Sequence, residues 1–168
     1  MARIPASIRC TAVGLGLLLA TSAAGAVLAP KKASDVRTVY GTAAASPACP
    51  GTGGWLLLDD VSNYDGTFTP FSIPAGSVFV VTSWEWVVLG ATPSATVLAY
   101  LAVADGSGGF SVLAADVATA DAGGAAKGQR TMPSGVTIKG GGPSLCYAFV
   151  GTIADQVVLA HGFLAKDN

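Results

Sequence analysis

The chain has 168 residues, a length that suits a single domain. Only 11% of the residues are charged and the formal net charge is −1, whereas about a quarter of an average globular domain is charged. The sequence has no basic stripe and no cluster of Lys and Arg among aromatic residues, so it argues against a nucleic-acid partner.

Residues 1–26 have the pattern of a secretory signal peptide, with a second possible cleavage point after residue 29. Arg3 and Arg9 give the positive start, residues 10–29 are uncharged, and small residues occupy positions 24–26. The alternative is an uncleaved membrane anchor, although its many small residues make it a poor bilayer span. Cleavage after residue 26 removes two of the nine basic residues, so seven basic and ten acidic residues remain and the net charge is −3. We expect a secreted protein, extracellular or periplasmic, with no membrane attachment after cleavage.

Two cysteines, Cys49 and Cys146, remain after cleavage. Because exported proteins form disulfides, we expect these two to pair. Residues 27–54 are rich in Ala, Ser, Pro and Gly and are expected to form an extended lead-in, in which 36–40 is either a strand or a linker. Residues 55–168 are expected to form one domain. The Ala- and Gly-rich, Lys-poor composition points to a bacterial source.

From residue 55 onward, short apolar segments alternate with turn signals. The segments are rich in Val, Thr and aromatic residues, and the clearest hairpin signal is DGSGG at 105–109. This spacing predicts an all-β, antiparallel β-sandwich, with a jelly roll preferred and an immunoglobulin-like sandwich as the second choice. The predicted strands are 55–60, 67–73, 77–90, 95–104, 110–120, 130–132, 136–139, 144–151 and 156–166.

The segment 77–90 contains Trp84, Glu85 and Trp86. Strand alternation places the two tryptophans on one face with Val80 and Val88, and Glu85 on the other. The tryptophans either fill the space between the sheets or form a platform that binds a glycan or a protein, or an oligomer interface. Without a bulge in the strand, one sugar ring cannot touch all three side chains.

Glu85, the one glutamate in the sequence, is the candidate catalytic residue. Alternation places it beside Phe79 and Val81, and a buried carboxylate with a raised pKa could act as a general acid in polysaccharide hydrolysis. That chemistry needs a second carboxylate, an aspartate, and the alternative is an exposed Glu85 without a catalytic role.

The end of the first predicted strand and the turn after it, residues 59–66, carry four oxygen-bearing residues. They could hold calcium in an irregular site, but they equally suit an ordinary turn. The candidate ligands are Asp59, Asp60, Asn63 and Asp65. His161 is the one histidine, which argues against a histidine-rich metal site, and no phosphate-binding or dinucleotide motif indicates a cofactor.

Three functions follow from these patterns. The first is a secreted non-enzymatic protein that binds a glycan or a protein, or assembles with copies of itself. The second is a secreted polysaccharide hydrolase that uses Glu85 with an aspartate. The third is a structural protein of the envelope or matrix, whose sign would be an apolar outer patch or an unprotected edge strand.

Overall fold

The computed structural model describes residues 29–44, 46–50, 53–62, 67–105 and 107–167, and the predicted signal peptide lies outside these ranges. Within them, a 3-10 turn, η1 (Ala33–Asp35), precedes ten strands. The strands are β1 (Val36–Thr42), β2 (Leu56–Leu57), β3 (Asp60–Ser62), β4 (Phe68–Pro70), β5 (Ser77–Leu89), β6 (Thr96–Ala104), β7 (Phe110–Thr119), β8 (Ala126–Lys139), β9 (Ser144–Val150) and β10 (Asp155–Lys166).

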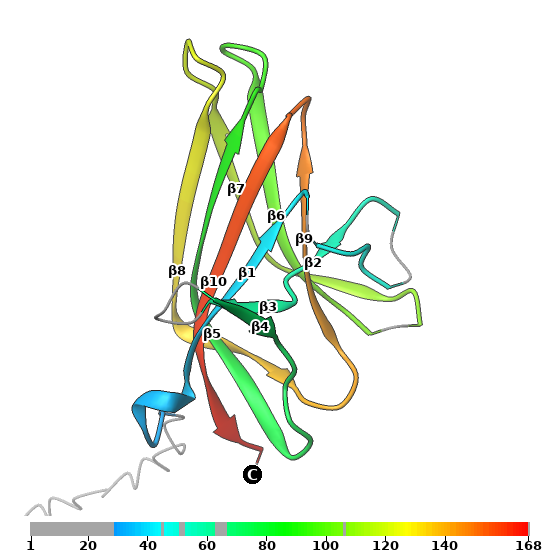
Figure 1. Cartoon of the computed structure of the whole chain (residues 1–168), viewed down its shortest axis with the longest axis vertical. Coiled ribbons are helices and arrows are strands. Elements are labelled where there is room, and N and C mark those ends of the chain that lie inside the picture. Colours follow the sequence, from blue (N-terminus) through cyan, green and yellow to red (C-terminus); the bar gives the residue numbers. More distant parts are fainter. Residues whose placement is uncertain (1–28, 45, 51–52, 63–66, 106, 168) are drawn as a thin grey trace, which may run out of the picture.

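The strands form two antiparallel sheets that pack against each other, which confirms the predicted β-sandwich (Figure 1). Sheet A has the strand order β4-β3-β1-β10-β5-β8, and sheet B has the order β2-β9-β6-β7. No helix in the described part of the chain is long and apolar enough to cross a membrane.

The pairing of the strands is that of a jelly roll. Leaving aside the short β3 and β4, the first strand pairs with the last and so on inwards: β1 with β10, β2 with β9, β5 with β8, and β6 with β7. Together these pairs form one long antiparallel ribbon of two strands. The ribbon folds over on itself, so that β10 also pairs with β5 and β9 also pairs with β6. This winding is the preferred topology of the two expected from the sequence. The β3–β4 hairpin extends sheet A beyond β1.

The turn between β6 and β7 lies where the DGSGG signal predicts a hairpin. The Asp105 carboxylate accepts hydrogen bonds from the backbone N–H groups of Ser107 and Gly109. These bonds, and first of all the one from the Ser107 hydroxyl, lower the pKa of Asp105. Asp105 therefore stabilises the turn by accepting hydrogen bonds from backbone N–H groups, which is the usual role of Asp in turns.

The sandwich begins earlier in the chain than the expected boundary at residue 55. β1 pairs with β10 along its whole length, from Val36 opposite Phe163 to Thr42 opposite Val157. Val39 is fully buried in the core. Part of the expected lead-in is thus a strand of sheet A, and the strand alternative for residues 36–40 is confirmed.

A bulge in β5 changes which of its residues face the core. Val81 pairs with Gly162 and Ser83 with the neighbouring His161, so Thr82 is an extra residue without a partner in β10. The same residue is skipped in the ladder with β8. Strict alternation, as expected from the sequence, is therefore wrong across Thr82, because an extra residue reverses the side-chain direction.

The consequence is an inner face that is apolar along the whole strand. The β5 residues in the core are Phe79 and Val81 before the bulge and Trp84, Trp86 and Val88 after it. The expectation that Glu85 shares a face with Phe79 and Val81 is therefore wrong, although Glu85 does lie opposite to the tryptophans. On the outer face, Glu85 is followed by the exposed Val87 and Leu89.

The expected disulfide joins Cys49 to Cys146 on β9, with a Cα–Cα distance of 6.0 Å and a sequence separation of 97 positions. Together with Ala104, Trp55 and Leu57, the two cysteines form a small cluster outside the main core. The segment around Cys49 is also held by backbone hydrogen bonds from Cys49 N–H to Trp55 and from Leu57 N–H to Pro47. The disulfide thus fixes this segment against the outer face of sheet B.

Candidate functional site

Trp84 and Trp86 are core residues. Both side chains have no exposed surface, and Trp86 packs edge-on against Phe149 of the opposite sheet, with ring centroids 5.6 Å apart. A platform that stacks on a sugar needs an exposed ring face. The structure therefore supports the interpretation in which these residues fill the space between the sheets.

The two indoles differ in their polar contacts. The Trp86 Nε1 donates a hydrogen bond of 3.1 Å to Asp116 on β7, and Asp116 also forms an ion pair with Arg130 on β8. The Trp84 Nε1 is buried and, among the described residues, has no hydrogen-bond partner. A side chain at Gly128 would collide with both Asp116 and Trp86. The Trp86 contact thus closes the side of the sandwich between β7 and β8.

Glu85 lies on the outer face of sheet A, in a row of polar side chains from three strands. The Glu85 Oε1 is 3.3 Å from the His161 Nε2, and the His161 Nδ1 is 3.0 Å from the Thr38 hydroxyl. Both side chains are partly exposed, with 41% of the Glu85 side chain and 34% of the His161 side chain accessible. His161 therefore holds the Glu85 carboxylate at the surface.

A shallow cavity of about 540 Å³ adjoins Glu85. Leu159 and Val87 contribute apolar surface to it, and Lys127 and Gln129 add polar groups. The ladder neighbours of Glu85 are Leu159 and Gln129, and neither is a carboxylate. Acid–base hydrolysis of a glycosidic bond needs a carboxylate pair. Among the described residues that line this cavity, Glu85 is the one carboxylate, so they do not supply a pair.

The outer face of sheet B is uncharged. The strand residues on this face are Leu57, Thr96, Leu98, Tyr100, Ala102, Ala104, Phe110, Val112, Ala115, Val117, Thr119, Ser144, Cys146, Ala148 and Val150. Four of them are large apolar residues with about half of their surface exposed: Phe110 (52%), Val112 (49%), Val117 (56%) and Val150 (55%). Asp116 is not on this outer face: its side chain points toward sheet A, where it accepts the hydrogen bond from Trp86. Leu113 is an extra residue in the pairing of β7 with β6, so the side chains after it change faces.

The segment around the disulfide covers one end of this face and leaves the other open. Ala104 and Cys146 are buried beneath it. Trp55 packs at a tilt against Phe110 and Tyr100, with ring centroids 5.2 Å and 6.1 Å away. Beyond the covered end, Val117 and Val150 lie on either side of β6, opposite Leu98. The outer face of sheet B is therefore an apolar surface that is covered only at one end. We call it the open face, and its exposed large apolar residues are Phe110, Val112, Val117 and Val150.

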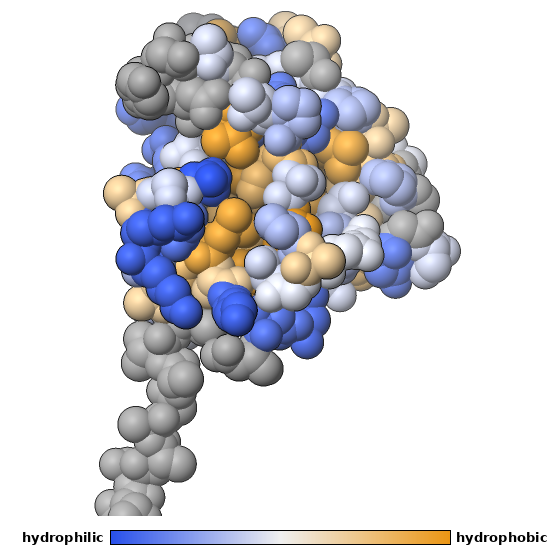
Figure 2. All heavy atoms as spheres, turned by 60° about the horizontal axis from the view of Figure 1, so that its bottom comes forward, coloured by the Kyte–Doolittle hydropathy of each residue, from blue (hydrophilic) through white to orange (hydrophobic). Residues whose placement is uncertain are grey.

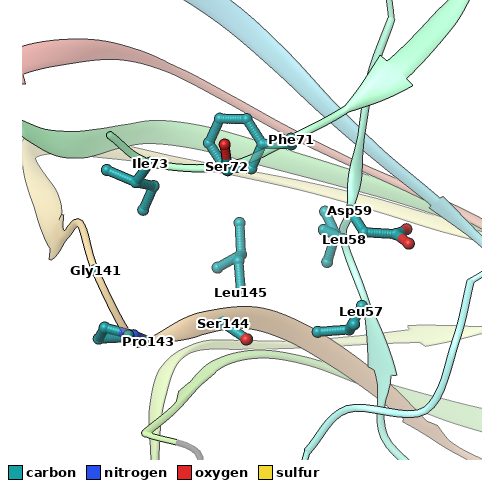
Figure 3. A pocket seen from close by; sticks show the side chains of 11 residues that line it. Leu57, Leu58, Asp59, Phe71, Ser72, Ile73, Gly141, Pro143, Ser144 and Leu145 are labelled. Atoms are coloured by element: carbon teal, nitrogen blue, oxygen red, sulfur yellow. The ribbon is translucent and has the colours of Figure 1, made fainter. Parts of the chain in front are cut away.

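A second apolar feature lies at one end of the sandwich. A cavity of about 290 Å³ opens between the β2–β3 segment, the residues that lead into β5, and the start of β9. We call it the end pocket. Figure 3 shows Leu58, Phe71, Ile73 and Leu145 pointing into it, while the Asp59 carboxylate points away. Figure 2 brings this end of the molecule forward and shows apolar surface inside a hydrophilic border.

Asp59 is half-buried at the side of the end pocket. Burial, followed by the nearby Asp60 carboxylate, raises the pKa of Asp59 above its ordinary value of 3.8. Asn63 and Asp65, the other candidate calcium ligands, lie outside the described residues, so that site remains a prediction. Among the described residues, no group of three or more metal-binding side chains is present.

Comparisons with known proteins give no match: no family model fits the sequence, and no curated protein or solved structure is significantly similar to it. The class that the structure itself defines is a disulfide-linked jelly-roll β-sandwich. A function has to be inferred from its surfaces.

The sequence patterns indicated a candidate site on β5 and did not indicate the open face or the end pocket. The sequence does contain a sign of the open face, because β6 and β9 are apolar at nearly every position. A sheet in a two-layer sandwich has only one face in the core, so the apolar residues of the other face must lie outside it. The end pocket left no comparable signal. Its residues come from 57–59, 71–73 and 141–145, which only the fold brings together.

Proposed function

We propose that the protein is an exported, non-enzymatic assembly module whose copies associate through the open face of sheet B. The observation that carries the proposal is the absence of charge on this face together with four exposed large apolar side chains. Exposed apolar patches mark association sites, because their removal from water is favourable. The signal-peptide pattern and the disulfide support export.

A second copy is the partner that fits this face best. Two uncharged faces can meet without repulsion between like charges, and a twofold pair places the same patch on both sides of the interface. A charged partner would lose hydration at this face and find no opposite charge there.

The edge strand β7 supports the same proposal. β7 pairs with β6 alone in the described ladders and is one of the two edge strands of sheet B, the other being the short β2. Its exposed residues include Phe110, Val112 and Val117. The outer strand of sheet A, β8, carries Lys127, Lys139 and Pro133, which are the usual protections against pairing with another chain. The β7 edge has its bulge at Leu113 but no outward charge.

The proposal is tested by the mass of the chain from residue 27 onward, measured by light scattering and sedimentation velocity over a wide concentration range. We expect a dimer or larger assembly at high concentration. Val112→Lys with Val117→Lys should shift the protein to the monomer, because it places two like charges in each half of the interface.

The matched control is Thr131→Lys with Thr137→Lys, which adds the same charge to exposed positions on the outer face of sheet A. It should leave the assembly unchanged. A monomer at every concentration would refute the proposal, and so would equal disruption by the two double variants.

A second candidate function, glycan binding, is favoured by the cavity beside Glu85. Carboxylate and amide groups such as Glu85 and Gln129 can hydrogen-bond sugar hydroxyls, and Leu159 offers an apolar surface to the C–H groups of a ring. A glycan array is the test. Binding that is lost in Glu85→Gln and retained in Asp121→Asn would support this function, and an array without any bound glycan would contradict it.

A further inference from the structure

The end pocket is separate from the exposed apolar residues of the open face. Its deep residues, Leu58 and Leu145, belong to the core between the sheets, and none of Phe110, Val112, Val117 and Val150 lines it. We propose that it binds a neutral, apolar small molecule of about ten carbon atoms, a size judged from cavities of ~150 Å³ that hold benzene. The cavity has a volume of about 290 Å³.

The pocket reaches the core of the sandwich. Leu58 and Leu145 form its deep part, with 2% and 3% of their surfaces exposed, and both belong to the main apolar core. Protein interiors are close-packed and contain few voids larger than a water molecule. An apolar hollow of this size that continues into the core is therefore suited to an apolar guest.

The walls of the pocket nearer to the solvent are apolar and only half-buried. Phe71 and Ile73, which lead into β5, and Leu57 of β2 retain exposed surface next to the hollow. In Figure 3, Phe71 and Ile73 face Leu145 across the space. A guest that removes these surfaces from water gains roughly 25 cal/mol for each Å² of apolar area buried.

The rim leaves the hollow open. Gly141 and Gly142 contribute no side chains to it, and the exposed Ser72 lies opposite. Ser72 and Ser144 offer hydroxyl groups at the lining, enough to accept one polar group of a guest. The arrangement of an apolar interior with few polar groups is that of ordinary small-molecule sites.

Charge selects a neutral guest over an anionic one. Asp59 is the one charged residue among those that line the pocket, and Asp60 follows it directly. Two carboxylates at the side of the hollow disfavour the binding of a further anion in their neighbourhood. The described residues of the lining include no Lys, Arg or His that could attract an anion. A fatty alcohol fits this environment better than a fatty acid of the same length.

The experiment uses N-phenyl-1-naphthylamine, a neutral apolar dye that fluoresces when it leaves water, titrated into the purified chain from residue 27 onward. We expect saturable binding of one dye per chain. Addition of 1-octanol should displace the dye at a concentration at least about tenfold lower than octanoate at neutral pH, because both competitors have eight carbon atoms and only octanoate carries a negative charge. Equal displacement would overturn the selection for a neutral guest.

Two variants fill the site from different sides. Ile73→Trp adds bulk to a wall, and Gly142→Phe adds a ring at the rim, where a Cβ meets no other atom within 4 Å. Each should weaken dye binding at least about tenfold with little change in melting temperature, since the guest and the new side chain compete for one volume. The pocket assignment is wrong if both folded variants bind the dye as the wild type does, or if the wild type shows no saturable binding.

The assembly variant Val112→Lys with Val117→Lys separates this site from the open face. It should retain dye binding at one per chain whether or not the protein assembles. Loss of the dye in this variant, together with normal binding in Ile73→Trp and Gly142→Phe, would place the dye on the open face and refute the pocket.

Discussion

Trp84 and Trp86 are both fully buried on the inner face of sheet A, yet their indole N–H groups have different surroundings. The Trp86 Nε1 donates to Asp116, whereas the Trp84 Nε1 has no partner among the described residues. A buried donor that is left unpaired is costly, and one that is paired contributes to stability. The same residue type therefore has two different energetic roles two positions apart.

This difference predicts that Trp86→Phe destabilises the protein more than Trp84→Phe. Both changes remove similar ring volume from the core, but only the first removes a hydrogen bond to a partly buried carboxylate, worth about 1 kcal/mol or more. Urea unfolding followed by circular dichroism measures both variants. Equal losses of unfolding free energy would show that the Trp86–Asp116 bond contributes nothing net.

Asp59 predicts a pH dependence of stability. Burial and then Asp60 raise its pKa above 3.8 in the folded protein. The folded state therefore holds this proton more tightly than the unfolded chain. The stabilisation from protonated Asp59 is fully present when the pH is below the pKa of Asp59 in the unfolded chain. It is lost as the pH rises through the higher pKa of Asp59 in the folded protein.

Asp59→Asn removes this titration. Relative to the variant, we expect the wild type to lose melting temperature as the pH rises past 3.8, the ordinary pKa of the group, and through its raised pKa in the folded protein. Asp60→Asn should reduce the effect without abolishing it, because burial remains the larger cause. Parallel pH profiles of the wild type and Asp59→Asn would rule out the raised pKa.

At the scale of single elements, the bulge at Thr82 decides the role of β5. The extra residue lets Phe79 and Val81 share a face with Trp84 and Trp86, and it leaves Glu85 outside. The Thr82 hydroxyl donates a hydrogen bond of 3.2 Å to the His161 backbone carbonyl, which holds the bulge against β10. Directly opposite, a side chain at Gly162 would collide with the Phe79 ring.

Deletion of Thr82 should prevent native folding. Without the extra residue, one half of β5 turns its apolar side chains to solvent and brings its polar ones to the core, since a shift by one residue exchanges the faces. Thr82→Ala keeps the residue count and should cost only about 1 kcal/mol for the lost hydrogen bond. Near-ultraviolet circular dichroism of the tryptophans distinguishes the two. A native spectrum for the deletion would refute this role of the bulge.

At the scale of the whole molecule, the disulfide joins the segment before β2 to β9 and so ties the early chain to a late strand. Closing a loop of this length removes conformational freedom from the unfolded chain, and it contributes roughly 4 kcal/mol in the chain-entropy model. The same bond holds the segment that buries Ala104 and one end of the outer face of sheet B.

The double variant Cys49→Ser with Cys146→Ser should therefore lower the unfolding free energy by roughly 4 kcal/mol while keeping the jelly roll, whose main core does not contain the cysteines. Denaturant titration with far-ultraviolet circular dichroism is the measurement. Reduction of the wild type should give the same loss. A variant as stable as the oxidised wild type would show that the bond does not stabilise this fold.

Much of the architecture follows from local patterns in the sequence. Apolar segments of strand length and turn residues such as Asp105 predict an all-β sandwich, because these signals act over a few residues. The pairing of Cys49 with Cys146 is expected from the export pattern of the sequence. The opposite directions of Trp86 and Glu85 follow from alternation alone, since no bulge lies between them.

Only the tertiary structure decided the rest. The extra residue in β5 is set by its pairing with β8 and β10, so alternation failed at Thr82 and misplaced Phe79. The end pocket combines segments more than 80 residues apart, from 57–59 to 141–145. Whether an apolar strand face is core or surface depends on what packs on it. The fold places Trp84 inside and Val117 outside, although both are apolar residues in strands.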